Sequence, residues 1–140
     1  MENVKIIELP KILDPRGNLS FFENSSQIPF DIKRTYWIYD VPGGETRGGH
    51  AFKKSTEFII ALSGSFDVIL SDGENEVKHS LNRSYYGLYV PSLIWRRIEN
   101  FSTNSLSLIV SSISYDQQDY IRDFDSFKQI RNEEKTKYSF

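Results

Sequence analysis

The regular spacing of turn signals is the feature that most constrains the fold of this 140-residue chain. Residues that favour chain reversal cluster at Asp14-Pro15-Arg16-Gly17, Val41-Pro42-Gly43-Gly44, Ser63-Gly64 and Asp72-Gly73. Between and beyond these turns lie short runs rich in β-branched and aromatic residues: Val4–Leu9, Leu19–Glu23, Ile32–Asp40, Glu57–Leu62, Ser65–Ser71, Glu76–Leu81, Tyr85–Val90 and Leu106–Ser112. Short strands at this spacing, with no helical pattern between them, predict an all-β sandwich or barrel.

The end of the chain follows a different period. From Asp119 onward the apolar residues recur at intervals of three and four, as in an amphipathic helix: Tyr120, Ile121, Phe124, Phe127 and Ile130. We expect this helix to pack on the β body, and the polar residues after it, Arg131–Tyr138, to fray. No internal repeat or low-complexity segment divides the chain, so residues 1–140 are expected to form a single domain.

The composition argues against several classes of protein. The chain has no cysteine, which excludes a disulfide framework, a thiolate metal site and a cysteine nucleophile. Its two histidines, His50 and His79, are too few for a multi-histidine metal centre. A net charge of −2 without a basic stripe argues against a nucleic-acid partner, although a few arginines can still hold a small anion. No signal peptide or membrane-spanning run is visible, so we expect no membrane partner and a cytoplasmic location.

Two residue clusters match the paired motifs of the cupin superfamily, whose fold is a small antiparallel jelly roll. The first motif combines spaced glycines with a histidine and a glutamate, and the second combines a proline with an asparagine. The matching residues are Gly44, His50, Glu57 and Gly64, then Pro91 and Asn100. The resemblance implies a cupin jelly-roll β-barrel, here followed by the short C-terminal helix.

The departures from the cupin pattern concern the metal. Metal-binding cupins place four ligands at positions that hold His50, Phe52, Glu57 and Arg96 in this chain. A phenyl ring has no lone pair to donate, and a guanidinium brings its own positive charge. We therefore predict that the barrel cavity is kept and that it holds no metal. Strand alternation places His50 and Phe52 on one face, and cupin topology turns Glu57 and Arg96 inward, where Glu57 is expected to pair with His50 or Arg96.

A narrower resemblance rests on five segments: Asp14-Pro15-Arg16-Gly17-Asn18-Leu19, Ile32-Lys33-Arg34-Thr35-Tyr36, Arg47-Gly48-Gly49-His50-Ala51, Tyr86-Gly87-Leu88-Tyr89-Val90 and Asp119-Tyr120-Ile121-Arg122. With them the chain is similar to the WxcM-like dTDP-4-keto-6-deoxyglucose 3,4-ketoisomerases, metal-free cupins that act in the synthesis of 3-amino-3,6-dideoxyhexoses for bacterial surface glycans. The likeness extends from about Lys5 to Phe127. It implies a homodimer that exchanges N-terminal strands, needs no cofactor and binds a dTDP-linked 4-keto-6-deoxy sugar in each barrel.

The implied reaction moves a ketone from C4 to C3 of the sugar through an enediol. His50 is the candidate acid/base because imidazole titrates near neutrality. Tyr36 and Arg96 are candidate donors to the developing oxyanion, and Tyr36 is also a candidate relay for a hydroxyl proton. The best-known members of the family carry His-Ala-His where this chain has His50-Ala51-Phe52. Either His50 therefore serves both carbons, or a tyrosine or a water handles the second transfer.

The remaining candidates bind substrate. Arg16 and Arg47 stand beside glycines in turn-like segments and are predicted to hold the diphosphate, for which bidentate arginine is well suited. Glu57, Phe52 and Arg96 are predicted to line the sugar cavity. Structural roles stay open as well, because Glu57 also fits a buried carboxylate paired with arginine, and Arg16 and Arg47 fit turn residues that satisfy carbonyls.

Two other functions stay open at this point. A dTDP-4-keto-sugar epimerase is also a cupin and also removes a proton next to the ketone. A cupin that lost catalysis when position 52 became phenylalanine would bind the dTDP-sugar without changing it.

Overall fold

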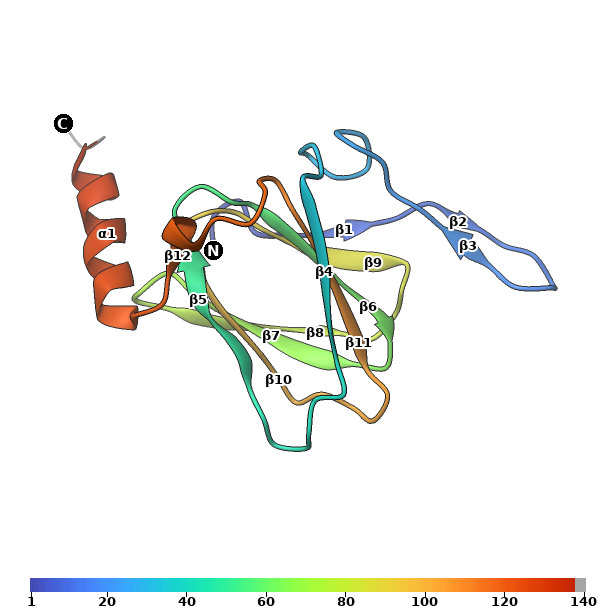
Figure 1. Ribbon diagram of the computed structural model, residues 1–140. Helices are drawn as coiled ribbons and strands as arrows, with labels where there is room; N and C mark the ends of the chain where they lie inside the picture. The colour runs from blue at the N-terminus through green and yellow to red at the C-terminus, as the bar shows by residue number, and fades with distance from the viewer. Residues whose placement is uncertain (138–140) are drawn as a thin grey trace.

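The computed structural model describes residues 1–137, and this part of the chain contains twelve strands, one 3-10 helix and one α-helix (Figure 1). The elements are β1 (Lys5–Glu8), β2 (Lys11–Ile12), β3 (Leu19–Ser20), β4 (Arg34–Tyr39), β5 (Arg47–Phe52), β6 (Glu57–Ser63), β7 (Phe66–Ser71), β8 (Glu76–Leu81), β9 (Tyr86–Val90), β10 (Trp95–Glu99), β11 (Leu106–Ser111), η1 (Gln117–Asp119), β12 (Tyr120–Ile121) and α1 (Phe124–Lys137).

Two five-stranded antiparallel sheets form the body, with strand orders β1-β9-β6-β11-β4 and β12-β5-β10-β7-β8 (Figure 1). Apolar side chains from both sheets are buried in one cluster, including Ile59 and Ile109 from the first sheet and Val68 and Ile98 from the second. The β7–β8 hairpin turns at the predicted Asp72-Gly73 pair, where Gly73 has a φ of 96°. The prediction of an all-β fold with a short C-terminal helix is confirmed, and the expected strands are present with ends shifted by a few residues.

The N-terminal strands β2 and β3 pair only with each other and extend away from the body (Figure 1). Their hairpin carries the exposed side chains of Ile12, Leu13 and Leu19. Strand β4 is the edge of the first sheet, and its Trp37 and Tyr39 are also exposed. An unpaired strand edge next to large exposed apolar side chains is a common feature of protein interfaces.

The segment before α1 corrects the expectation of a helix from Asp119. Tyr120 and Ile121 form β12, which pairs with Phe52 and Ala51 of β5. The Asp119 carboxylate accepts the backbone N–H groups of Lys54 and Ser55, which fixes the segment to the end of β5. These tertiary bonds override the helical period.

Helix α1 begins after Asp123, whose carboxylate accepts the backbone N–H and the hydroxyl of Ser126, as an N-cap does. The helix continues to Lys137, so the structure differs from the fraying expected over residues 131–137. Arg131 donates to the backbone carbonyl of Leu93 and ties this turn to the body. Tyr138, also expected to fray, lies outside the described residues.

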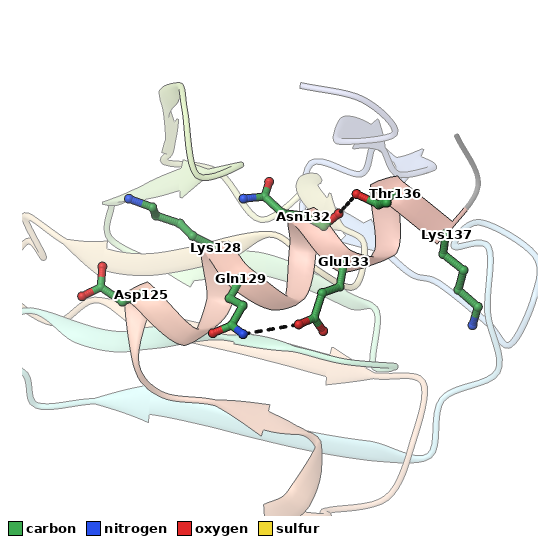
Figure 2. Close-up of a pocket in the computed structure, with 7 residues that line it drawn as sticks. All are labelled: Asp125, Lys128, Gln129, Asn132, Glu133, Thr136 and Lys137. Atoms are coloured by element: carbon green, nitrogen blue, oxygen red, sulfur yellow. Dashed lines mark hydrogen bonds between the residues drawn. The ribbon is translucent and has the colours of Figure 1, made fainter. Parts of the chain in front are cut away.

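A hollow of about 650 Å³ runs along α1, and all of its lining residues belong to that helix (Figure 2). Figure 2 shows Gln129 bonded to Glu133 and Thr136 bonded to Asn132 along the helix surface. This hollow is therefore the polar outer surface of one helix. In residues 1–137 no helix is long and apolar enough to cross a membrane.

Candidate active site

A cavity of about 390 Å³ opens between the two sheets, and we call it the site cavity. Strands β4, β5, β10 and β12 supply most of its lining, which consists of Arg34, Tyr36, Trp37, Ile38, Arg47, Gly48, Gly49, His50, Arg96, Tyr120 and Arg122. Four of these residues are arginines and none is acidic. The lining therefore has the electrostatics of a binding site for an anion.

A buried charged pair lies at the base of the site cavity. Arg96 Nε donates to Glu57 Oε1 at 2.7 Å, and each side chain is only 1% exposed. The Tyr36 hydroxyl donates to Glu57 Oε2 and accepts a bond of 2.7 Å from Arg96 Nη2. The predicted pairing of Glu57 with Arg96 is confirmed. It holds the guanidinium in one orientation, with Arg96 facing the cavity and Glu57 behind it.

This network keeps Tyr36 and Arg96 in fixed protonation states. Burial, the largest cause, raises the pKa of Tyr36 above its ordinary value; the charge of Arg96 opposes this rise, and Glu57, which accepts the Tyr36 proton, adds to it. Burial alone lowers the pKa of Arg96, but the adjacent Glu57 carboxylate reverses the direction and the pKa is raised. Near neutral pH Tyr36 is a phenol and Arg96 a cation, the forms that can donate hydrogen bonds to an oxyanion.

His50 lies opposite Arg96 in the β5–β10 ladder and lines the site cavity. Its ring contacts those of Phe52 and Tyr120, with centroids 4.9 and 5.0 Å apart. Its Nε2 atom is buried and has no hydrogen-bond partner in the described part of the chain. Burial lowers the pKa of His50 to about 3, with further contributions from Arg96, Arg122 and Arg34. The imidazole is therefore neutral near pH 7, with a ring nitrogen that lacks a protein partner.

A β-bulge brings Arg47 and His50 to the same cavity. The β5–β10 register pairs Arg96 with His50 but Ile98 with Arg47, so β5 contains one extra residue between them. Gly48 supplies the bulge with a φ of 75°, and a Cβ at this position would lie 2.5 Å from Arg96 Nη1. In a regular strand, residues three apart face opposite sides, so Arg47 and His50 could not both line the cavity without the bulge. The Gly48-Gly49 pair is the sequence signal for such a bulge.

Strand β12 contributes residues that the sequence reasoning did not identify as part of the site. Tyr120 faces Phe52 in the ladder, with ring centroids 4.7 Å apart, and its hydroxyl accepts a bond of 2.8 Å from Arg34 Nη1. The guanidinium of Arg122 lies 4.4 Å from the centre of the Tyr120 ring. Tyr120 and Arg122 belong to the segment Asp119-Tyr120-Ile121-Arg122, on which the family resemblance partly rests, and this was the signal for their role in the site. The apolar period of the same segment predicts a helix instead.

The structure brings Tyr36, Arg47, His50 and Arg96 together in the site cavity. Phe52 packs against the His50 ring instead of facing the cavity, with Arg96 6.0 Å from its centre. Arg16 is not brought to the cavity of its own chain. It lies on the β2–β3 hairpin, where its side chain is 90% exposed and pairs with Asp14 at 2.8 Å.

The residues at the four cupin ligand positions do not suit a metal ion. Phe52 and Arg96 offer no lone pair, and both oxygens of Glu57 are occupied by bonds from Arg96 and Tyr36. Within residues 1–137 no group of three or more His, Cys, Asp or Glu residues is placed to hold a metal ion. The groups that line the site cavity and can take part in chemistry are instead two phenols, four arginines and one imidazole.

Comparison with known proteins gives consistent matches over nearly the whole chain. The model of the family described as "FdtA: WxcM-like, C-terminal" matches residues 2–132. A TDP-4-oxo-6-deoxy-alpha-D-glucose-3,4-oxoisomerase of Aneurinibacillus thermoaerophilus is 43% identical over 129 residues, which are 92% of each chain.

Solved structures agree with this match. QdtA, a sugar 3,4-ketoisomerase of Thermoanaerobacterium thermosaccharolyticum, has a TM-score of 0.93 and 36% identity, covering 96% of this chain and 98% of its own. WlaRB, a TDP-quinovose 3,4-ketoisomerase of Campylobacter jejuni, has a TM-score of 0.88 and 43% identity, covering 92% and 99%. A dTDP-4-dehydrorhamnose 3,5-epimerase of Bacillus anthracis, only 16% identical with a TM-score of 0.74 over 84% of this chain and 77% of its own, shares the fold alone. The chain belongs to the FdtA (WxcM-like, C-terminal) family, in which its close relatives are TDP-sugar 3,4-ketoisomerases.

Proposed function

We propose that this protein is an isomerase that converts dTDP-4-keto-6-deoxyglucose into a dTDP-3-keto-6-deoxyhexose through an enediol. The observation that carries the proposal is the neutral His50 imidazole, which lacks a protein partner at Nε2 and lies in a cavity shared with Tyr36 and Arg96. Relatives support the substrate class, because QdtA was crystallised with TDP and a variant of it with TDP-4-keto-6-deoxyglucose.

His50 is the proposed base for the hydrogen at C3, which the neighbouring C4 carbonyl acidifies. Its lowered pKa keeps it unprotonated in the free protein, and the negative charge of a bound diphosphate and of the enediolate would raise that pKa during reaction. Arg96 and Tyr36 are the proposed donors to the developing oxyanion. Tyr36 is also proposed to pass a proton between the two sugar oxygens, for which its hydroxyl would turn from Glu57 to the substrate.

The diphosphate is assigned to arginine. Arg47 lines the site cavity beside the glycine bulge and is the proposed contact from the same chain. Arg16 is the second proposed contact, and its exposed place on the β2–β3 hairpin means that it would have to act in a neighbouring molecule. Phe52 acts on the sugar site only indirectly in this proposal, because its ring packs against that of His50.

A homodimer with exchanged N-terminal strands would give Arg16 that place. The hairpin exposes Ile12, Leu13 and Leu19, and Leu13 is 72% exposed, which is a large apolar surface for a free hairpin. Trp37 on the free edge of β4 offers a matching apolar surface.

Hybrid dimers test this assembly. At low substrate concentration, Arg16→Ala subunits should be slow because they bind substrate weakly, and His50→Asn subunits should be inactive. Mixing the two should recover part of the activity, because one cavity of the hybrid then has both residues. No recovery in a mixture shown by mass spectrometry to contain hybrids would contradict the exchange.

The product would serve a 3-aminotransferase that makes a 3-amino-3,6-dideoxyhexose for a bacterial surface glycan. The cytoplasmic location expected from the sequence remains a prediction.

The direct test of the proposed function incubates the protein with fresh dTDP-4-keto-6-deoxyglucose and a 3-aminotransferase in D₂O and identifies the sugar by NMR. A 3-amino sugar supports the proposal. Deuterium at C5 with inversion would identify an epimerase, and binding of dTDP without any conversion would identify a non-catalytic cupin.

A further inference from the structure

The phenyl group at position 52 leaves this site with one imidazole for a reaction that moves two protons, one from C3 and one to C4. In the described part of the chain, the lining of the site cavity contains three side chains that can give up a proton: His50, Tyr36 and Tyr120. Arginine stays protonated in proteins and cannot serve. The second transfer therefore falls to a tyrosine, to water or again to His50.

Tyr36 is poorly placed for transfer to carbon because its hydroxyl already has two partners. Its proton is donated to Glu57, and its oxygen accepts from Arg96. Burial also raises its pKa, which makes its phenolate a costly product. Tyr36 suits the exchange of a proton between substrate oxygens, where the hydroxyl gives one proton and takes another.

Tyr120 has the opposite arrangement. Its oxygen accepts a bond of 2.8 Å from Arg34 Nη1, and no acceptor among residues 1–137 takes its own proton. Arg122 lies over the ring at 4.4 Å, so two cations stand next to the phenolate that proton donation would leave. The phenol thus has its proton free to donate into the cavity, with Arg34 bonded to its oxygen and Arg122 over its ring.

Tyr120 also lies next to Phe52, the residue that stands in place of a second imidazole. Tyr120 pairs with Phe52 in the β12–β5 register, and the two rings lie 4.7 Å apart. Its ring centroid is 5.0 Å from that of His50. The Tyr120 ring therefore lies in one cluster with His50 and with Phe52, the position at which the family resemblance implies a second imidazole.

We propose that Tyr120 is the second catalytic residue, the general acid that delivers the proton to C4 in the isomerisation proposed above. His50 Nε2 takes the C3 hydrogen as a proton, the C3–H electron pair forms the C3=C4 bond, and the carbonyl pair moves to O4. The O3 proton passes to O4. The O3 electrons then re-form the carbonyl at C3, and the C3=C4 pair takes the Tyr120 proton to make the C4–H bond. Water removes the proton from the imidazolium and returns one to the phenolate.

The variant Tyr120→Phe separates the two transfers, because it keeps the ring and removes only the hydroxyl. In D₂O, NMR of dTDP-4-keto-6-deoxyglucose should show exchange at C3 within about threefold of the unaltered protein, while 3-keto product falls about 100-fold or more. The matched control is Tyr115→Phe, since Tyr115 also contacts Arg34 and Tyr120 but does not line the cavity. It should form product at the normal rate.

Product formation by Tyr120→Phe at a normal rate would overturn the assignment, and so would loss of C3 exchange together with product. An isotope test on the unaltered protein shows, even if the variant does not fold, whether His50 delivers the second proton. Substrate deuterated at C3, converted in H₂O, should give product without deuterium at C4, whereas transfer of the label from C3 to C4 would show that His50 serves both carbons. If the unaltered protein forms no 3-keto product, the proposed isomerase function itself fails. This result differs from every outcome that contradicts only the role of Tyr120.

Discussion

Arg96 and Glu57 form an ion pair of 2.7 Å in which both side chains are removed from solvent, and the same guanidinium forms the base of the site cavity. The pair links β10 of one sheet to β6 of the other. Taking both charges out of water is costly, and the Tyr36 hydroxyl offsets part of this cost by bonding to each partner. The Arg96–Glu57 pair therefore joins the two sheets and also positions a group of the candidate active site.

The variant Glu57→Gln should lower the free energy of unfolding by about 3 kcal/mol, because it leaves the Arg96 charge buried without its counterion. Urea denaturation measures the change. Glu76→Gln is the matched control, since Glu76 pairs with Arg97 on the surface at 3.1 Å and should cost less than about 1 kcal/mol. Equal effects of the two variants would contradict the structural role given to the buried pair.

The variant Gly48→Ala should be destabilised more than Gly44→Ala by about 2 kcal/mol. Both glycines have positive φ, 75° and 86°, so both variants carry the same backbone cost of roughly 1–2 kcal/mol. Only at Gly48 would the new Cβ meet another group, Arg96 Nη1, whereas Gly44 has open space. Thermal denaturation compares the two, and similar stability for both would argue against the close approach of Arg96 to the bulge.

Stability should depend on pH through His50. Its pKa is about 3 in the folded chain and has the ordinary value of 6.5 when unfolded, so the unfolded state binds more protons between these values. The part of the unfolding free energy that comes from keeping His50 neutral is fully present above pH 6.5. It is lost as the pH falls toward 3, by at most about 1.4 kcal/mol per pH unit. The variant His50→Asn should show a shallower fall of the unfolding free energy over this range. An unchanged slope would mean that His50 is not buried in its neutral form.

Binding of dTDP should depend on Arg47. The variant Arg47→Ala should weaken dTDP binding about tenfold in calorimetry, since it removes a charged contact of about 1.4 kcal/mol, and it should reduce the salt dependence of binding. Arg83→Ala is the control, because Arg83 is an exposed residue that donates to the backbone of Asn82 and does not line the cavity. Normal affinity in Arg47→Ala would remove Arg47 from the diphosphate site.

Much of the β body could be predicted because alternating apolar residues and turn signals are local. Glu76–Leu81 has the same bounds in the structure as in the sequence prediction. The helix start could not be placed in this way, since Tyr120 and Ile121 satisfy a helical period while Asp119 holds them in a strand on β5. The Asp123 cap was the local signal for the true start.

The placement of a site residue could be predicted where it follows from strand alternation. It could not be predicted where it depends on contacts between segments far apart in the sequence. Cupin spacing limited the partner of Glu57 to His50 or Arg96, and the structure shows that it is Arg96. The placement of Arg47 beside His50 required a bulge, and that of Arg34 against Tyr120 required the β12–β5 pairing, which joins segments far apart in the chain. Arg16 cannot be placed by one chain at all, because its hairpin extends away from the body (Figure 1).

In the proposed reaction one imidazole, that of His50, removes the C3 proton of the sugar. The most direct measurement is the loss of the C3 proton signal of dTDP-4-keto-6-deoxyglucose in D₂O, followed by NMR with the unaltered protein, His50→Asn and the control His79→Asn. We expect that His50→Asn still binds dTDP but exchanges the C3 proton about 1,000-fold more slowly, while His79→Asn behaves as the unaltered protein does. Exchange at C3 by His50→Asn at the normal rate would contradict the account.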